Sequence, residues 1–329
     1  MTPTPHISSD NETFGMIGRD AKLRQIIKTI QTVAPSDASV LIEGESGTGK
    51  QLMAEAIHAR SRRSSGPFVH VNCAAIPTGL LEAELFGYQQ KRGLMEAATF
   101  GTLLLDEIVE MPGHWQTRLF RVLQERKLCR LGDDVQRDID CRLVVTTNRN
   151  TIDLLDEGVL RKDLYFRIST IKIKVPALRE RLDDIPLIAQ HFLERFNTQY
   201  DRRIRGISQE AALRLVRYDW PGNIRELESV IERAVLFCPG DELLPECLPE
   251  QLQSKDSRPV CFVIPPLVPM EEIEREAILQ TLARTSGNVK RSAQILRYPR
   301  PTFYRKLKKF GIKVDRTGPR SAGKLATSA

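Results

Sequence analysis

Short apolar runs alternate with longer segments of helical spacing in the first half of the chain. Buried strands are expected where β-branched and leucine residues follow one another over roughly four to eight positions. Five such runs are SVLIEG (39–44), FVHVNC (68–73), TLLLDE (102–107), RLVVTTN (142–148) and IKIKVP (171–176). Between them lie helix-like stretches such as QLMAEAIHAR and QTRLFRVLQERK. Strands that alternate with helices favour a parallel sheet with helices on both faces.

After Pro176 the strand pattern ends, and apolar residues recur only at helical spacing. The segments DDIPLIAQHFLERF and NIRELESVIERAVLF therefore predict an all-helical subdomain. A proline-rich stretch then indicates a linker, which three further helices and a basic tail follow. The predicted divisions are a flexible N-terminus (1–13), an α/β subdomain (14–178), a helical lid subdomain (179–250), a linker (251–268), a small helical domain (269–313) and a basic tail (314–329).

The last three helical segments, MEEIEREAILQTLART, NVKRSAQIL and PTFYRKLKKF, have the spacing of a small domain. The second and third share apolar positions that predict a common core: Val289, Ala293, Leu296, Phe303 and Leu307. The first is amphipathic, with Ile273, Ile278 and Leu282 on one side. That side either pairs two subunits or packs on its own domain.

Basic residues are concentrated at the C-terminal end of a chain of 329 residues and net charge +7. From Arg284 onward there are 13 lysines and arginines and one acid, a net charge of +12. The remainder carries 36 basic and 41 acidic residues, a net charge of −5. A strongly basic end on a mildly acidic body favours a polyanionic partner at that end, although a solvated tail would have the same composition.

The composition does not indicate a membrane or secreted protein. No stretch approaches the ~20 apolar residues that span a bilayer, and the polar start MTPTPHISSDNETFG is unlike a signal peptide. The six cysteines are scattered without a C-x-x-C pair, which favours reduced thiols over disulfides or a zinc site. We therefore expect a cytoplasmic protein with no membrane partner.

The sequence GESGTGK, at 44–50, follows the first predicted strand and opens a helix. It fits the phosphate-binding pattern G-x-x-x-x-G-K, in which backbone N–H groups surround phosphate oxygens and the lysine reaches the β- and γ-phosphates. The serine or threonine that usually follows, and that binds magnesium, is replaced by Gln51. The predicted ATP-binding residues of this loop are Gly44, Glu45, Ser46, Gly47, Thr48, Gly49, Lys50 and Gln51.

Asp106 and Glu107 end the third predicted strand. A carboxylate at that position can hold Mg²⁺, and a second can orient and polarise the attacking water. We assign these roles to Asp106 and Glu107 respectively, with ATP as the nucleotide. Asn148 ends the next strand and is placed to face the γ-phosphate. Arg161 and Arg167 either stabilise charge in a neighbouring subunit's site or form structural ion pairs.

Together these motifs resemble those of a known family. The order of motifs in the AAA+ domain of bacterial enhancer-binding proteins, the sigma-54-dependent activators, is reproduced by GESGTGK, FVHVNCAAIP, ELFG, GTLLLDEI, RLVVTTNR, DLYFRI, LRERLDDIPLIAQHF and WPGNIRELESVIERAV. The resemblance covers residues 14–249, and a later segment, GNVKRSAQILRYPRPTFYRKLKKFGI, resembles the Fis-type helix-turn-helix. It implies an α/β AAA+ P-loop NTPase with an all-α lid and a C-terminal all-α DNA-binding domain. It also implies a short form without an N-terminal regulatory domain.

The resemblance implies further site residues. Asn72 matches the residue that restrains the catalytic glutamate, and Thr147 and Asn148 match sensor I. Arg161 and Arg167 match the arginine fingers that enter the neighbouring subunit's site. Arg225, in GNIRELE, matches sensor II on the lid. A site shared in this way implies self-association into a ring, usually a hexamer.

One working part of that family has no counterpart in this sequence. Family members carry a long loop between ELFG and the strand that ends in Asp-Glu, and its Gly-Ala-Phe-Thr-Gly-Ala tip grips the sigma-54 subunit of RNA polymerase. Only 13 residues lie between Gly87 and Gly101, and they do not contain the tip. Residues 88–93, YQQKRG, predict a tight turn in its place. We therefore do not expect this protein to remodel sigma-54 polymerase by itself.

The basic C-terminal helix is the predicted recognition helix for double-stranded promoter or enhancer DNA. Its cations would neutralise phosphates, while side chains near its start would read bases. The predicted DNA-facing residues are Arg300, Thr302, Tyr304, Arg305, Lys308 and Lys309. The preceding turn has Arg297 where glycine is usual, followed by Pro299 and Pro301. A proline in the first helical turn is compatible with the helix.

These observations predict an ATP-dependent, DNA-binding transcription regulator that acts on RNA polymerase holoenzyme, and three alternatives stay open. One is a true sigma-54 activator that uses a shortened loop or a mixed ring with a full-length paralogue. A second is a replication-initiator-like AAA+ protein, against which ELFG and WPGNIRELE argue. The third is a repressor with a vestigial ATPase, against which the intact acids and arginines argue.

Overall fold

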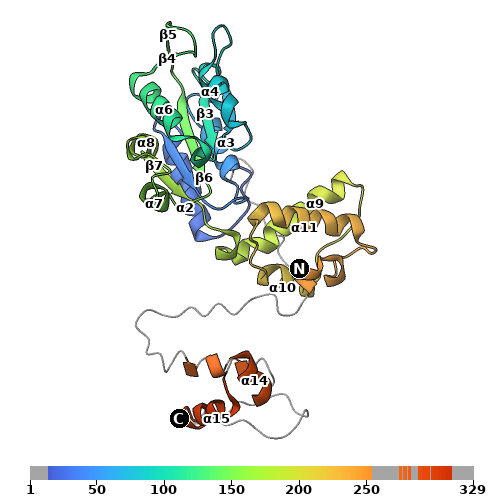
Figure 1. Ribbon diagram of the computed structural model, residues 1–329. Helices are drawn as coiled ribbons and strands as arrows, with labels where there is room; N and C mark the ends of the chain where they lie inside the picture. The colour runs from blue at the N-terminus through green and yellow to red at the C-terminus, as the bar shows by residue number, and fades with distance from the viewer. Residues whose placement is uncertain are drawn as a thin grey trace. The chain divides into compact units, whose positions relative to one another are not determined.

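The computed structural model describes residues 14–253, 274–275, 277–279, 281–282, 288–296 and 298–312. The chain divides into two compact units, Met1–Pro259 and Val260–Ala329, and each is described by itself (Figure 1). Several sequence predictions fall outside the described residues: the flexible N-terminus (1–13), most of the linker (254–268), the basic tail (314–329), Ile273, Arg297 and the side chain of Arg300.

A five-stranded parallel sheet lies at the centre of the first unit (Figure 1). In spatial order its strands are β2 (Phe68–Asn72), β3 (Thr102–Asp106), β6 (Arg142–Thr147), β1 (Val40–Glu43) and β7 (Ile171–Lys174). The five apolar runs of the sequence are these five strands, and the predicted α/β class is confirmed. Because the strands are parallel, the carboxyl ends of β1, β3 and β6 lie side by side at one edge, where α/β sheets usually bind their ligands.

Strand alternation explains why the middle of each central strand is apolar on both faces. Successive side chains of a strand point to opposite faces of the sheet. In β3, Leu103 and Leu105 pack on one face while Leu104 packs on the other. In β6, Leu143 and Val144 are divided between the two faces in the same way. Every residue of β6 is buried, because helices cover both faces.

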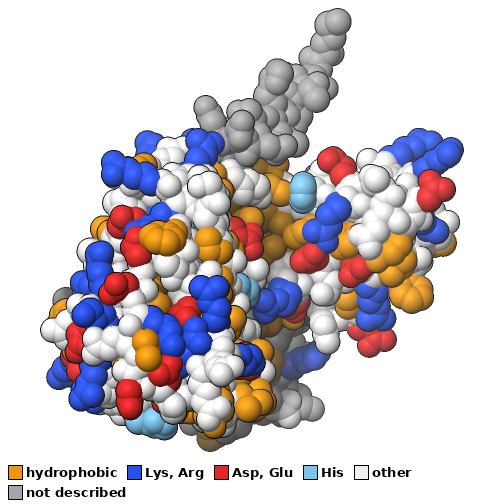
Figure 2. Space-filling model, turned by 90° about the horizontal axis from the view of Figure 1, so that it is seen from above, with side chains coloured by type: hydrophobic (Ala, Val, Ile, Leu, Met, Phe, Trp, Pro, Cys, Tyr) orange, Lys and Arg blue, Asp and Glu red, His pale blue; other side chains and the backbone are white. Residues whose placement is uncertain are grey.

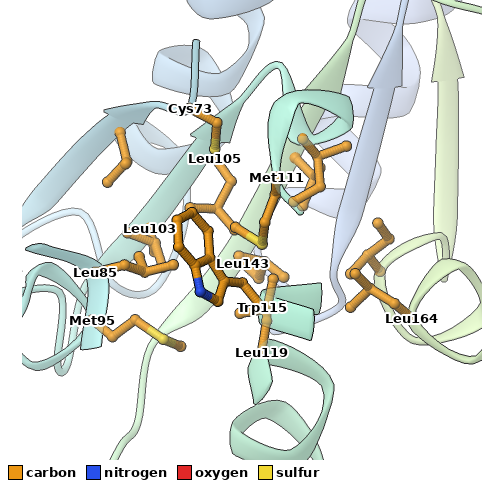
Figure 3. Close-up of a cluster of buried hydrophobic side chains, with 14 of the residues drawn as sticks. Cys73, Leu85, Met95, Leu103, Leu105, Met111, Trp115, Leu119, Leu143 and Leu164 are labelled. Atoms are coloured by element: carbon orange, nitrogen blue, oxygen red, sulfur yellow. The ribbon is translucent and has the colours of Figure 1, made fainter. Parts of the chain in front are cut away.

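Helices cover the two faces of this sheet (Figure 1). One face carries α2 (Ala21–Val33) and α3 (Lys50–Ala59). The other carries α4 (Thr78–Phe86), α5 (Leu94–Ala97), α6 (Gly113–Glu125), α7 (Thr151–Asp156) and α8 (Lys162–Ile168). The core on this second face includes Trp115 of α6, which lies among Leu103, Leu105 and Leu143 (Figure 3).

Two short elements complete the α/β part. A 3-10 turn, η1 (Ile108–Glu110), follows β3 directly. A two-stranded antiparallel ribbon of β4 (Lys127–Cys129) and β5 (Gln136–Asp138) lies between α6 and β6 in the sequence.

An all-α lid follows β7 within the same unit. Its elements are η2 (Leu178–Glu180), η3 (Leu182–Asp184), α9 (Ile185–Gln199), α10 (Gln209–Arg217), α11 (Asn223–Phe237), η4 (Pro245–Cys247) and α12 (Glu250–Gln253). They enclose a core that contains the fully buried Trp220, whose indole N–H donates to the Leu215 carbonyl oxygen at 2.8 Å. Trp220 and Asn223 have φ values of 50° and 52°. These left-handed conformations make the WPGN segment a sharp bend that leads into α11.

The described part of the second unit consists of helical residues between 274 and 282, α14 (Val289–Ile295) and α15 (Arg300–Lys309). Its core confirms the predicted set: Ala293, Phe303 and Leu307 are buried, and Val289 and Leu296 pack against them.

The amphipathic segment before α14 packs on its own unit. Ile278 and Leu282 belong to the same small core as α14 and α15, which was one of the two alternatives. Glu274, from the same segment, accepts a hydrogen bond from the Tyr298 hydroxyl and pairs with Lys306 of α15. In the part of the chain that the structure describes, helices are too short or too polar to cross a membrane.

Candidate functional site

The predicted phosphate loop connects the end of β1 to the start of α3. The Gly44 N–H donates to the Thr147 carbonyl oxygen at 3.1 Å and extends the pairing of β1 with β6 by one residue. Gly47 and Gly49 have φ values of 76° and 94°, a region that residues with a Cβ rarely adopt. A Cβ on Gly47 would lie 2.3 Å from the Gly222 carbonyl oxygen of the lid. Glycine at this position therefore lets the lid touch the loop.

Lys50 is the first residue of α3, directly after this loop, and its side chain is 6% exposed. Its ammonium donates to the carbonyl oxygens of Gly44 at 2.8 Å and Glu45 at 3.2 Å. The same Nζ lies 3.6 Å from Glu107 Oε1. By contrast, the Gln51 side chain is exposed and donates to Glu55 Oε1, one turn along α3, at 2.9 Å. The structure thus brings the loop lysine to Glu107, the acid that directly follows β3, but it directs Gln51 along the surface of α3.

Asp106 and Glu107 are held by β6. Asp106 accepts a hydrogen bond from the Thr146 hydroxyl. The oxygen of that hydroxyl in turn accepts a hydrogen bond from the Glu107 N–H at 3.1 Å. Glu107 Oε2 accepts from the Asn148 N–H at 3.0 Å. Burial raises the pKa of Glu107, while the nearby Lys50 ammonium opposes that rise. The result is a partly buried carboxylate that is held between the phosphate loop and the end of β6.

Asn72 stands opposite Asp106 in the β2–β3 register. Its Oδ1 accepts from the N–H groups of Ala74 at 2.9 Å and Ala75 at 3.2 Å, which makes a local turn. The Glu107 carboxylate instead has a hydrogen bond from Asn148 and an ion pair with Lys50. The Asn148 contact is made by its backbone N–H.

The lid clamps the phosphate loop through the start of α11. The buried Asn223 side chain donates to Glu45 Oε2 at 3.1 Å and the Ser46 carbonyl oxygen at 3.0 Å, and it accepts from the Leu178 N–H at 2.8 Å. Arg225 donates to the Ser46 hydroxyl at 3.1 Å. The loop and the lid therefore hold one another through these hydrogen bonds.

Arg179, at the start of the lid, adds a bidentate ion pair with Glu45, at 2.5 and 2.8 Å. This pair holds the carboxylate and lowers the pKa of Glu45. Both side chains are about two-fifths exposed, so the pair is screened by solvent.

Arg161 and Arg167 lie at the two ends of α8, on the surface. Arg161 forms an ion pair with Asp163 at 2.7 Å, and Arg167 donates to the Leu123 carbonyl oxygen at 2.8 Å. Among the described residues, no hydrogen bond or ion pair is recorded between either arginine and the loop 44–51. These contacts are compatible both with a role in a neighbouring subunit's site and with structural ion pairs.

The residues of this site would fit a Mg²⁺ ion that comes with the nucleotide. Among the described residues, no three His, Cys, Asp or Glu side chains gather into a cluster that could hold a metal. Mg²⁺ is commonly bound by one or two carboxylates together with substrate phosphates and waters. Asp106 offers such a carboxylate beside the phosphate loop, and its side chain is 19% exposed.

The segment predicted to replace the long loop is a closed turn between α4 and α5. The Tyr88 N–H donates to the Lys91 carbonyl oxygen at 3.1 Å, and the Lys91 N–H donates back to Tyr88 at 2.8 Å. The Gln89 N–H donates to the Leu131 carbonyl oxygen at 2.8 Å, which ties the turn to the segment after β4. Lys91 pairs with Glu84 at 2.5 Å. Seen from this end of the subdomain, Lys and Arg side chains are interspersed with Asp and Glu side chains (Figure 2).

The candidate DNA-facing residues lie on α15. Phe303 and Leu307 point into the core of the second unit, so the opposite side of the helix faces solvent. Of the predicted set, four side chains are exposed and Thr302 is half-buried; the four are Tyr304, Arg305, Lys308 and Lys309. Lys306, which was not predicted to face DNA, pairs with Glu274 instead.

Sequence reasoning missed three residues that hold the candidate site: Thr146, Arg179 and Asn223. Strand alternation could have indicated Thr146, because it shares a sheet face with Val144, as Asp106 does with Leu104. Arg179 and Asn223 act across the interface between the sheet and the lid. The local pattern of the chain contains no signal for that interface.

Comparison with known proteins matches the chain along most of its length. The sigma-54 interaction domain matches residues 16–174, the AAA+ ATPase lid domain matches 179–260, and the Fis family of bacterial regulatory proteins matches 269–310. Transcriptional regulatory protein ZraR of Escherichia coli K12 is 40% identical over 321 residues, which are 92% of this chain and 70% of that protein. Regulatory protein AtoC of the same strain is 42% identical and covers 88% of this chain and 66% of that protein.

Among solved structures, NtrX from Brucella abortus is similar in both its ADP and its ATP complex. Each has a TM-score of 0.69 and 33% sequence identity over 92% of this chain. The match covers 72% of the ADP-bound chain and 71% of the ATP-bound chain.

Proposed function

This chain belongs to the family of sigma-54-dependent transcriptional regulators, and we propose that it acts there as an ATP-hydrolysing, DNA-binding regulator. The observation that carries the proposal is the approach of Lys50 Nζ to Glu107 Oε1 at 3.6 Å, beside Asp106 at the end of β3. A phosphate-binding cation and a candidate base meet there at the carboxyl edge of a parallel sheet. The ATP and ADP complexes of the similar NtrX support ATP as the nucleotide.

ATP would bind with its phosphates in the loop 44–50. The loop's backbone N–H groups and the start of α3 favour negative charge. Lys50 now donates to carbonyl oxygens of its own loop, and a phosphate oxygen would replace them as its acceptor. Arg225 contacts Ser46 from the lid, so it would approach a nucleotide bound in the loop from the lid side.

Glu107 would act on the water that attacks the γ-phosphorus. Its carboxylate accepts the Asn148 N–H, which fixes the direction of one oxygen. Because burial raises the pKa of this acid above its ordinary value, it is a stronger base than an exposed glutamate. Asp106 would hold Mg²⁺, and that ion would neutralise charge on the β- and γ-phosphates when bound.

The two arginines of α8 support a ring in which each site is shared. Arg161 and Arg167 are exposed, and their recorded contacts are with Asp163 and Leu123. In phosphoryl transfer an arginine supplied by a neighbour stabilises the charge of the transition state. We propose that these residues complete the site of the next subunit in a hexamer, formed with copies of this chain or with a family paralogue.

The closed turn between α4 and α5 supports a limit on how this protein can act on sigma-54 polymerase. Six residues, 88–93, reach at most about 20 Å when extended and roughly half of that as a hairpin. Their ends meet in the structure, because a Cβ on Gly93 would lie 2.4 Å from the Gly87 nitrogen. The turn YQQKRG also lacks the Phe-Thr pair of the family's loop tip. We propose that this protein does not remodel sigma-54 polymerase by itself.

ATP turnover by wild type, Glu107→Gln and Glu110→Gln tests the proposed enzyme activity. Glu110 is a matched control, because it is an exposed acid in η1, just after the site. We expect Glu107→Gln to bind ATP and to hydrolyse it at least about 100-fold more slowly, while Glu110→Gln matches wild type. Wild-type protein that binds ATP without turnover at any concentration would favour a repressor with a vestigial ATPase.

A further inference from the structure

Thr146 is a fully buried polar residue at the carboxyl end of β6. Its hydroxyl makes two hydrogen bonds, and both lead to the candidate acids. It donates to Asp106 Oδ1, and it accepts from the Glu107 N–H at 3.1 Å. A hydroxyl has one donor and two acceptor positions, so a single threonine can make both contacts at once.

The sheet brings these groups together. Asp106 and Thr146 follow the same alternation as Leu104 and Val144, whose side chains share the face under α2 and α3. Threonine also suits the position because a β-branched side chain has few χ1 rotamers in a strand. The hydroxyl is therefore held in a fixed direction beneath the Asp106 carboxylate.

Each carboxylate oxygen of Asp106 has a polar neighbour, but only Thr146 is within hydrogen-bond distance. Thr146 occupies Oδ1, while His70 Nε2 from β2 lies 3.7 Å from Oδ2. Glu107, the next residue, has φ 57° and ψ 57°, a conformation that is uncommon for a non-glycine residue. The bond from its N–H to Thr146 helps to hold that conformation, which directs the side chain toward Lys50.

We propose that Thr146 is a positioning residue for ATP hydrolysis. Its hydroxyl orients the Asp106 carboxylate toward the metal–phosphate group and fixes the backbone from which Glu107 reaches the attacking water. Thr146 touches neither nucleotide nor water in this role, and it acts only through the two acids. The inference rests on the ATP hydrolysis proposed above.

Three variants of the full chain test this role. Thr146→Val keeps the shape and removes the hydroxyl, whereas Thr146→Ser keeps the hydroxyl. Thr102→Val is a matched control, because Thr102 is a fully buried threonine at the opposite end of β3 whose hydroxyl contacts His58. For each protein we would measure the kcat and KM for ATP and the thermal midpoint. We would also measure the Kd of a fluorescent ATP analogue with Mg²⁺ and with EDTA.

We expect Thr146→Val to lower kcat about 10- to 100-fold with little change in KM, the range expected when a hydrogen bond to a charged group is lost. Thr146→Ser should retain most of the activity. Thr102→Val should lose thermal stability without a fall in kcat. Mg²⁺ should also strengthen nucleotide binding less in Thr146→Val than in wild type, because outer partners of a metal ligand affect metal affinity about 10- to 100-fold.

ATP turnover and the effect of Mg²⁺ on nucleotide binding together distinguish a failure of the Thr146 role from a failure of the proposed ATPase. Active wild type with an equally active Thr146→Val would overturn the inference and leave the ATPase in place. A rise in KM that matches the loss of stability, without the fall in kcat, would show a merely structural threonine. If wild type itself does not hydrolyse ATP, the proposed function fails, and the Mg²⁺ effect on binding still decides the role of Thr146. Equal effects in wild type and Thr146→Val would then refute it.

Discussion

The Lys50 ammonium lies 3.6 Å from the Glu107 carboxylate, across the space between the phosphate loop and the end of β3. Both side chains are largely buried, so the pair is screened less than a surface ion pair would be. Lys50 can leave this pair for a phosphate oxygen, because its ammonium also has carbonyl partners within the loop. Binding of the nucleotide would then free Glu107 to act on water.

The first prediction concerns the pH dependence of Glu107. Burial raises its pKa above the ordinary value of 4.5, so kcat should fall as the pH is lowered through the raised pKa. The folded protein binds this proton more tightly than the unfolded chain does. The contribution of Glu107 to stability is therefore full below pH 4.5 and is lost as the pH rises through the raised pKa.

Urea unfolding of wild type and Glu107→Gln at a series of pH values tests whether the contribution of Glu107 to stability falls as the pH rises. Wild type should lose stability relative to the variant as the pH rises through that window. A difference between the two proteins that does not change with pH would contradict the assigned shift.

The second prediction concerns the arginines of α8. If Arg167 completes a neighbour's site, ATP turnover per subunit should rise with protein concentration, and Arg167→Ala should be inactive at all concentrations. A mixture of Lys50→Ala and Arg167→Ala should recover part of the activity, because some sites then combine an intact loop with an intact arginine. Normal turnover by Arg167→Ala alone would exclude a shared site.

The third prediction concerns the clamp between the lid and the loop. Asn223→Ala should destabilise the folded protein by about 2–4 kcal/mol, because one buried and two partly buried hydrogen bonds are lost and alanine is strained at φ 52°. Asn223→Gly removes the same bonds but tolerates that φ, so it should cost less. Urea unfolding of both variants separates the cost of the lost hydrogen bonds from the cost of backbone strain. Equal losses would mean that backbone strain contributes nothing.

The fourth prediction concerns DNA recognition by α15. In the full chain, Arg305→Ala should weaken binding to native promoter DNA by about 1–3 kcal/mol if this exposed side chain reads a base. Lys306→Ala is the matched control, because Lys306 is paired with Glu274 and lies over the Tyr298 ring. It should change the stability of the domain more than its selectivity. Equal affinity of wild type for native and random duplexes at physiological salt would argue against a specific regulator.

Much of the fold follows from local patterns in the sequence. The five apolar runs became the sheet because each is long enough for one buried strand and is separated from the next by helical segments. The small core around Phe303 followed from helical spacing for the same reason. Lys50, Asp106 and Glu107 could be chosen because their motifs stand at strand ends, and parallel strands end at a common edge.

The contacts that hold the site could not be predicted in this way. Asn223 reaches Ser46 across the sheet–lid interface, from a left-handed bend that local pattern does not reveal. Gln51 was placed in the loop by its position in the motif, but its side chain bonds to Glu55 along α3. Both outcomes depend on competition between hydrogen-bond partners in the folded protein, and sequence spacing does not show which partner prevails.

The most direct test of a regulator that turns over ATP without a loop tip is transcription in vitro by sigma-54 polymerase. The template would carry this protein's binding site upstream of a sigma-54 promoter, and ATP hydrolysis would be measured in the same reactions. We predict ATP turnover without open complexes when this protein acts alone. Open complexes that appear only when a full-length family member is added would support a mixed ring. Abundant open complexes formed by this protein alone would contradict the proposed limit and would mean that a surface other than residues 88–93 contacts sigma-54.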